Sequence, residues 1–173
     1  MIRWAFFPKT DPLPKELSQP ITIFQNNFEQ IDSSRNDTNE LRLSSDRVLA
    51  LVADSFVDAG YKVETGKKKE QKIRVPVLFG HQGTISQAFE VDGWHEENRI
   101  VLEIEAGRAY TNHQFLKDIF EASVMVNVDF LVLAVRTIYK KHHDFEKITE
   151  WLETLYATNR IEFDLKGILV IGY

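Results

Sequence analysis

One stretch decides the fold prediction: Glu90-Val-Asp-Gly-Trp-His-Glu-Glu-Asn-Arg-Ile-Val-Leu-Glu-Ile-Glu-Ala-Gly-Arg108. Its composition indicates two strands, residues 88–94 and 99–104, joined by a tight turn. If Glu97 and Asn98 are the central residues of that turn, Asp92 lies opposite Glu103. Residues two apart on a strand point to one face, and opposed residues of an antiparallel pair share a face. We therefore expect the carboxylates of Asp92, Glu103 and Glu105 to converge.

The three acids stand in an apolar setting, because Ile100, Val101, Leu102 and Ile104 mark a core strand. Like charges on one face repel each other, so they make poor structural residues without a partner. A hard divalent cation, Mg²⁺ or Mn²⁺, is the natural partner for carboxylate oxygens. The alternative is a solvated sheet face with Asp92 starting a turn. That alternative loses weight because we expect helices on both sides of the sheet.

The rest of the sequence predicts an α/β fold, with a mixed β-sheet flanked by helices. Apolar residues recur at helical spacing over residues 21–31 and again over 44–57, where Ser44 or Ser45 is a candidate N-cap. Two further helices are expected, one opened by a capping box at residues 111–114 and one capped by Asp144. Strands are expected at residues 61–64, 73–79, 128–135 and 167–171, and the first residues are expected to pack on the core as a strand or apron. The strands 73–79, 88–94 and 99–104 are expected to pair as a meander.

Composition bounds the remaining possibilities. The 173 residues fit a single domain: 1–43 form an N-terminal extension and helix, 44–135 the region of the motif, and 136–173 a C-terminal helix and strand. The absence of cysteine excludes disulfides and thiolate metal sites. No apolar run is long enough to cross a bilayer, so we expect no membrane association and a cytoplasmic location. The net charge of −5 argues against a surface coated in positive charge, although local contacts with DNA remain compatible with it.

The pattern of Asp92, a spacer and Glu103-Ile-Glu105 in an apolar strand resembles the motif of the PD-(D/E)XK nucleases. Glutamate in place of the final lysine resembles the BamHI/BglII branch of the type II restriction endonucleases. The resemblance covers residues 44–135 and implies a restriction-endonuclease-like core. It also implies that Asp92 and Glu103 bind the metal and that Glu105 orients or activates the attacking water. Val91 stands where that family usually has proline.

The same family often adds an acid from the helix that precedes the sheet, and Asp46 is the candidate here, with Glu40 as a weaker one. An aspartate in a first helical turn also simply complements the helix dipole.

Basic and polar residues near the motif are candidates for binding nucleic acid: Lys67, Lys68, Lys69, Lys72, Arg108, His113 and Lys117. A lysine run is equally typical of a solvated loop, and Arg108 or Lys117 could instead pair with an acid. For His113, an ordinary polar position in a first helical turn is the plainer interpretation.

Together these observations predict a Mg²⁺- or Mn²⁺-dependent deoxyribonuclease that acts as a homodimer, since cutting two strands commonly requires two copies. The alternative is a catalytically inactive nuclease-fold module that binds DNA or another protein. Metal binding discriminates between the two hypotheses.

Overall fold

The computed structural model describes residues 1–34, 43–107, 109–139 and 142–173, and it contains a six-stranded mixed sheet. The strand order is β1-β8-β7-β6-β5-β2. The bounds of these strands are β1 Arg3–Phe7, β2 Lys62–Val63, β5 Gly93–His95, β6 Ile100–Glu105, β7 Phe130–Val135 and β8 Gly167–Gly172. The three central strands are parallel, and β1, β5 and β2 are each antiparallel to their neighbours. The predicted mixed sheet is therefore confirmed, and the N-terminal residues form one of its strands.

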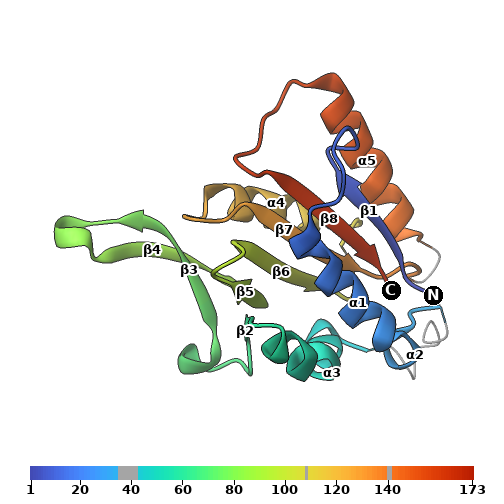
Figure 1. Ribbon diagram of the computed structural model, residues 1–173, viewed down its shortest axis with the longest axis horizontal. Helices are drawn as coiled ribbons and strands as arrows, with labels where there is room; N and C mark the ends of the chain where they lie inside the picture. The colour runs from blue at the N-terminus through green and yellow to red at the C-terminus, as the bar shows by residue number, and fades with distance from the viewer. Residues whose placement is uncertain (35–42, 108, 140–141) are drawn as a thin grey trace.

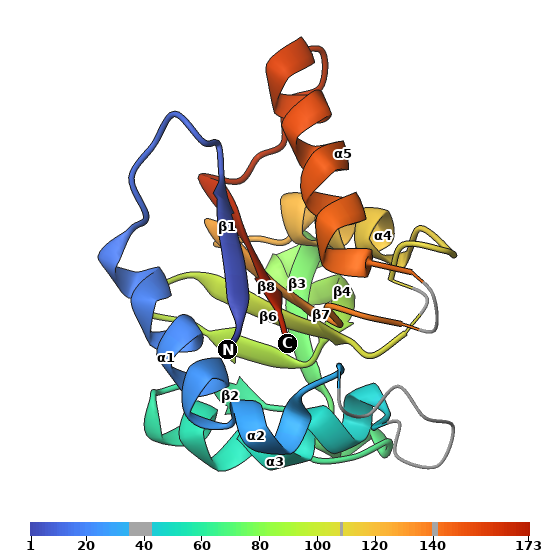
Figure 2. The same cartoon turned by 90° about the vertical axis from the view of Figure 1, so that its right-hand side faces the viewer.

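Helices cover both faces of this sheet (Figure 2). On one side lie η1 (Lys15–Leu17), α1 (Ser18–Asn26), α2 (Phe28–Ile31) and α3 (Ser45–Asp58), and on the other lie α4 (Gln114–Val124) and α5 (Asp144–Thr158). Each layer has its own apolar core, because alternate residues of each strand point to opposite faces. Leu102 and Ile104 belong to the core beneath α1 and α3, whereas Val101 belongs to the core beneath α4 and α5. No helix among the described residues is both long and apolar enough to cross a membrane.

A long hairpin projects from this body as a separate two-stranded sheet, which we call the arm (Figure 1). It consists of β3 (Ile73–Phe79) and β4 (Ile85–Val91), preceded by η2 (Lys69–Gln71) and turned by η3 (His81–Gly83). The pairings predicted for the meander are found, since β3 pairs with β4 and β5 pairs with β6. The prediction of one continuous sheet is wrong, because β3 and β4 form a sheet of their own instead of extending the main sheet. The single strand expected over 88–94 is divided at Asp92, where the chain bends from the arm into β5.

The helix boundaries differ from the expected ones in three places. The N-terminal helix begins earlier, at Ser18, and is interrupted at Asn27. The helix expected to open with a capping box begins instead at Gln114, because His113 adopts a left-handed conformation with φ 52° and its side chain does not cap the helix. Asp144 is the first residue of α5 and is fully buried, so it is not an N-cap. For α3 the prediction is confirmed, since the Ser44 hydroxyl accepts from the Arg47 N–H at 3.2 Å.

Candidate functional site

The bend at Asp92 brings this side chain against β6. Gly93 pairs with Leu102, which is the register predicted from the sequence. A Cβ atom on Gly93 would lie 3.3 Å from the Leu102 side chain, so glycine lets β5 approach closely here. On the N-terminal side of Gly93 the chain turns away from β6 into the arm. At this bend, Asp92 Oδ2 accepts a hydrogen bond from the Ile104 N–H at 2.8 Å. One residue thus connects the root of the arm to the strand that carries the two glutamates.

Glu103 and Glu105 lie on the side of β6 that faces α4 and α5. Glu103 is beside Leu133 of β7 and Glu105 is beside Val135, and both neighbours belong to the core beneath those helices. Both glutamates are half-buried at the end of the parallel strands. The chain then leaves the sheet at Gly107, where a Cβ atom would lie 2.6 Å from the Tyr139 ring. A side chain at position 107 would therefore displace the Tyr139 ring.

A fourth carboxylate, Asp118 on α4, lies with these acids. Asp118 is 4% exposed, and its Oδ2 has no hydrogen-bond partner among the described residues. Its neighbours along the same helix face, Phe115, Ile119 and Ala122, are all buried. Asp118 was not predicted as a site residue from the sequence. A charged side chain within the apolar stripe of an amphipathic helix is the signal that could have identified it.

Burial and mutual repulsion shift all four acids in the same direction. Burial raises the pKa of Asp92 to about 6, although the hydrogen bond from Ile104 opposes the shift. Burial, reinforced by Asp118 and Asp92, raises the pKa of Glu105 to about 8. Burial raises the pKa of Asp118 to about 7. The pKa of Glu103 is raised well above its ordinary value, first by burial and then by Asp92, Asp118 and Glu105. The four groups therefore act as one electrostatic unit.

Two lysines, each paired with a glutamate, border these four acids. Lys117 lies 3.2 Å from Glu121, and its ammonium opposes the raised pKa values of Glu103, Glu105 and Asp118. Lys72 is half-buried at 2.7 Å from Glu64, and this hydrogen bond raises the pKa of Lys72. Glu64, a second residue that the sequence analysis missed, donates its backbone N–H to the Asp92 carbonyl at 2.9 Å. Because Glu64 is bound to Asp92 in this way, its partner Lys72 points into the site. Lys67, Lys68 and Lys69 are exposed instead.

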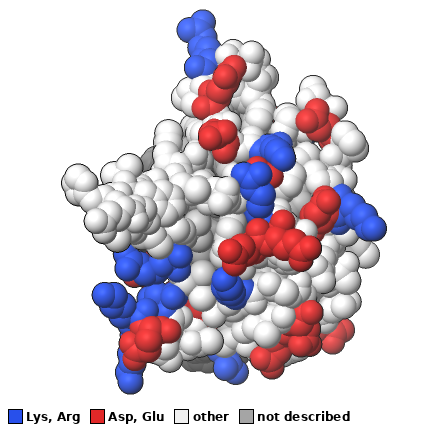
Figure 3. Space-filling view, turned by 60° about the vertical axis from the view of Figure 1, so that its left-hand side comes forward, with Lys and Arg blue, Asp and Glu red and all other residues white. Residues whose placement is uncertain are grey.

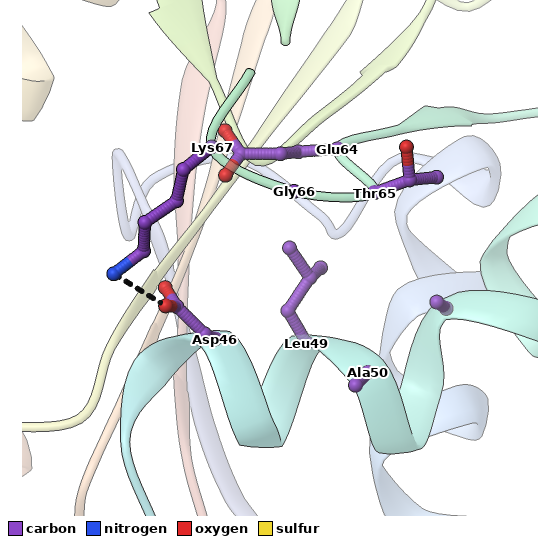
Figure 4. Close-up of a pocket in the computed structure, with 8 residues that line it drawn as sticks. Asp46, Leu49, Ala50, Glu64, Thr65, Gly66 and Lys67 are labelled. Atoms are coloured by element: carbon purple, nitrogen blue, oxygen red, sulfur yellow. Dashed lines mark ion pairs between the residues drawn. The ribbon is translucent and has the colours of Figure 1, made fainter. Parts of the chain in front are cut away.

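Asp46 occupies the first turn of α3, as predicted, and its charge contributes to the raised pKa of Asp92. Its carboxylate pairs with Lys67 at 3.1 Å across a cavity of about 280 Å³ between α3 and residues 64–67 (Figure 4). Ser45 of the same turn accepts a hydrogen bond from the Ala106 N–H at 3.1 Å, which ties α3 to the end of β6. Asp46 thus lies at the margin of the acids, with a lysine as its direct partner.

Among the other predicted DNA-binding residues, Lys67, Lys68, Lys69 and His113 are exposed. Arg108, together with Glu40, the weaker candidate for an additional acid, lies outside the described residues. Figure 3 shows a group of acidic side chains with lysine and arginine side chains around it on one face of the molecule.

The acids supply carboxylate oxygens, the type of ligand that a hard divalent cation prefers. Within the part of the chain that the structure describes, however, no three acidic or histidine side chains are arranged closely enough to hold a metal ion as they stand. The strands and α4 bring the acids together, but their oxygens do not form a preassembled coordination shell.

The sequence matches no protein-family model and no curated protein. Among solved structures, the chain is similar to the restriction endonuclease BglII in complex with a DNA 16-mer, with a TM-score of 0.54 and 12% sequence identity. The similarity covers 99% of this chain and 75% of that one. The chain thus has a restriction-endonuclease-like fold, a mixed sheet between two layers of helices.

Proposed function

We propose that this protein is a divalent-metal-dependent endonuclease that hydrolyses phosphodiester bonds in DNA. The observation that carries the proposal is the coupled group of Asp92, Glu103 and Glu105, half-buried on the central sheet of a restriction-endonuclease-like fold. A group of like charges with raised pKa values at one end of a sheet is more typical of a functional site than of a structural one.

Asp92 and Glu103 are the residues that would hold Mg²⁺ or Mn²⁺, with Asp46 at the margin. Such an ion would lower the pKa of a bound water and neutralise charge on the phosphoryl oxygens. Glu105 is the candidate base, because it lies two residues from Glu103 on the same face of β6, where its carboxylate would be beside a water on that ion. The hydrogen bond from the Ile104 N–H holds the Asp92 carboxylate against β6.

DNA contact is assigned to the basic and polar residues around the acids. Lys67, Lys68 and Lys69 are exposed and can meet phosphates, and Arg108, His113 and Lys117 follow the motif strand in the sequence. Lys72 differs from them, since its ammonium is held by Glu64 at 2.7 Å. We assign Lys72 to balancing the charge of the acids rather than to a phosphate.

A second copy of this chain is the proposed protein partner, because cutting both strands of a duplex requires two sites. The arm is the surface best suited to that contact. Residues 75–89 carry no Asp, Glu, Lys or Arg, so two copies meeting there bring no like charges together. Leu78, Phe79 and Ile85 on the arm are 57%, 48% and 58% exposed.

A second candidate function is a nuclease-fold module that binds DNA without cutting it. The observation in its favour is that no group of three metal-binding side chains is preassembled within the described residues. The two candidates differ in their dependence on metal, because only the nuclease requires a cation at the acids.

The test is cleavage of supercoiled plasmid by the purified chain with Mg²⁺ or Mn²⁺, compared with EDTA. We expect nicking or cutting with metal, its loss in Glu103→Gln and its retention in Glu162→Gln, a change at an exposed glutamate far along the chain from the motif. Circular dichroism of each variant establishes that it is folded. Robust cleavage by folded Glu103→Gln would remove Glu103 from the mechanism. DNA binding without metal-dependent cleavage would favour the second candidate.

A further inference from the structure

A cavity of about 330 Å³ lies at the base of the arm, away from the acids. Its apolar lining comes from Val75, Pro76 and Phe79 of β3, from Trp94 of β5 and from Val126, which follows α4. The cavity is several times larger than the roughly 30 Å³ that one water molecule occupies in the liquid. It therefore has room for an apolar side chain.

The tip of the arm, residues 79–85, presents apolar side chains on the same side as this cavity. Phe79 is paired with Ile85 in the register of the hairpin, so the two side chains share a face. Because Phe79 also lines the cavity, Ile85 lies on the cavity side of the arm. Ile85 is 58% exposed, and Figure 1 shows that the tip extends away from the rest of the described chain. One face of the arm thus carries both an apolar projection and an apolar cavity.

This arrangement is self-complementary. Two copies related by a two-fold axis contact each other through the same patch. If two arms lie antiparallel, the tip of each meets the base of the other. β3 has seven residues, which at about 3.3 Å each make the arm roughly 20 Å long. An antiparallel pair therefore overlaps along the whole arm and brings two tips to two cavities.

The charges at the two ends of the patch also match. The tip has no acidic side chain, and His81 and Gln82 supply hydrogen-bond donors there. Glu97 lies at the rim of the cavity and forms no ion pair among the described residues. A tip that reaches the cavity therefore places donors beside a carboxylate and brings no like charges together.

The base of β3 is closed to the other way in which hairpins associate, which is pairing of strand edges. Pro76 has no N–H to donate to an added strand. Its carbonyl already accepts a hydrogen bond from the Val126 N–H at 2.8 Å. A second copy can therefore reach this part of the arm through the cavity rather than through the edge of β3.

We propose that the cavity at the base of the arm receives the arm tip of a second copy, with Ile85 of each chain inserted into the cavity of the other. This inference rests on the dimer of the proposed function, and it names the surface that the arm contacts.

The test is site-directed crosslinking, for which the chain is suited because it has no cysteine. Ile85→Cys is mixed with Glu97→Cys, and the reduced mixture is oxidised with copper phenanthroline. A size tag on one of the two chains separates the mixed product from the two self-products on a non-reducing gel. A disulfide requires Cα atoms within about 7 Å, so the yield reports proximity.

The matched control is Ser86→Cys mixed with Glu97→Cys. Ser86 is also exposed and follows Ile85 directly on β4, so its side chain points to the other face of the arm. Circular dichroism under reducing conditions establishes that each variant is folded. Light scattering of Ile85→Ala and Ser86→Ala measures the same contact without a crosslink.

We expect the Ile85→Cys and Glu97→Cys pair to crosslink at least about tenfold faster than the control pair, because a dimer holds the two thiols at a high effective concentration. Ile85→Ala should weaken the dimer about tenfold, and Ser86→Ala should leave it unchanged. A dimer in which Ile85→Cys crosslinks only with itself, or no faster than the control, would overturn the inference and leave the dimer in place. A chain that stays monomeric would overturn both, whereas metal-dependent nicking of plasmid by that monomer would still support the nuclease.

Discussion

The carboxylate of Asp92 accepts a hydrogen bond from the backbone N–H of Ile104 at 2.8 Å, which fixes the end of the arm against the motif strand. This contact gives Asp92 a structural role separate from its charge. An asparagine at this position retains an oxygen that can accept from Ile104, whereas alanine does not.

We therefore expect Asp92→Ala to be less stable to urea than Asp92→Asn by about 1 kcal/mol, the usual contribution of one hydrogen bond. Both variants remove the charge, so their difference isolates the acceptor. The same pair of substitutions at Asp54, an exposed residue of α3, serves as the control. Equal stability of the two Asp92 variants would show that the bond to Ile104 contributes nothing.

Stability should fall as the pH rises in the absence of divalent metal. The pKa values of Asp92, Asp118 and Glu105 are raised to about 6, 7 and 8, above those of the unfolded chain. The folded state therefore binds more protons than the unfolded state at intermediate pH, and its advantage is lost as these groups ionise. In EDTA, we expect these groups to lower Tm progressively from about pH 4, near the pKa values of the unfolded chain, to about pH 8.

The contribution of Glu105 can be separated by substitution. Glu105→Gln should melt close to the wild-type temperature near about pH 4, where the carboxyl is protonated in the folded and the unfolded chain, and increasingly above it up to about pH 8. Urea unfolding of both proteins across this range measures the difference. A constant difference between the two proteins would contradict a raised pKa for Glu105.

The lysines of the run should divide into two classes. Replacing Lys67, Lys68 and Lys69 with alanine should weaken DNA binding and reduce the slope of log Kd against log salt by about 0.9 for each phosphate that the protein no longer neutralises. Lys72→Ala should instead lower Tm, because it leaves half-buried Glu64 without its partner. Lys15→Ala, at an exposed lysine of η1, is the control for a general charge effect. An unchanged salt slope in the triple variant would exclude those lysines from the DNA interface.

The arm should determine the oligomeric state. The double variant Leu78→Glu, Ile85→Glu introduces charge at two exposed apolar positions outside the main sheet. We expect it to convert a dimer to a monomer in light scattering while Tm of the monomer stays within a few degrees of wild type. Val57→Glu places the same charge on α3, at a residue that is 55% exposed, and should leave the dimer intact. A double variant that remains dimeric would place the contact elsewhere.

Much of the architecture follows from local patterns, which explains why it was predictable. The apolar run at residues 128–135 and the alternation in 99–105 depend on the two-residue period of a strand, and they predict β7, β6 and the shared face of Glu103 and Glu105. The two central residues of the turn also predict the pairing of Gly93 with Leu102.

The features that were missed depend on tertiary contacts. The alternation in 88–94 continues through Asp92, so nothing local separates β4 from β5, and the break becomes visible only with the hydrogen bond to Ile104. The start of α4 depends on the left-handed conformation of His113, which only a few per cent of non-glycine residues adopt and which the sequence alone does not locate. Asp118 belongs to the site because α4 packs on β6, a long-range contact that a single sequence does not reveal.

The division of β4 and β5 at Asp92 also has a mechanical consequence. The arm and the main sheet share no strand, but the base of the arm is held on the body by more than the chain itself. The Val126 N–H donates to the Pro76 carbonyl at 2.8 Å, and Val75 and Val91 are buried in the core beneath α4 and α5. A force on the exposed tip of the hairpin therefore reaches the body through this packed base and through Asp92, whose side chain is hydrogen-bonded to β6.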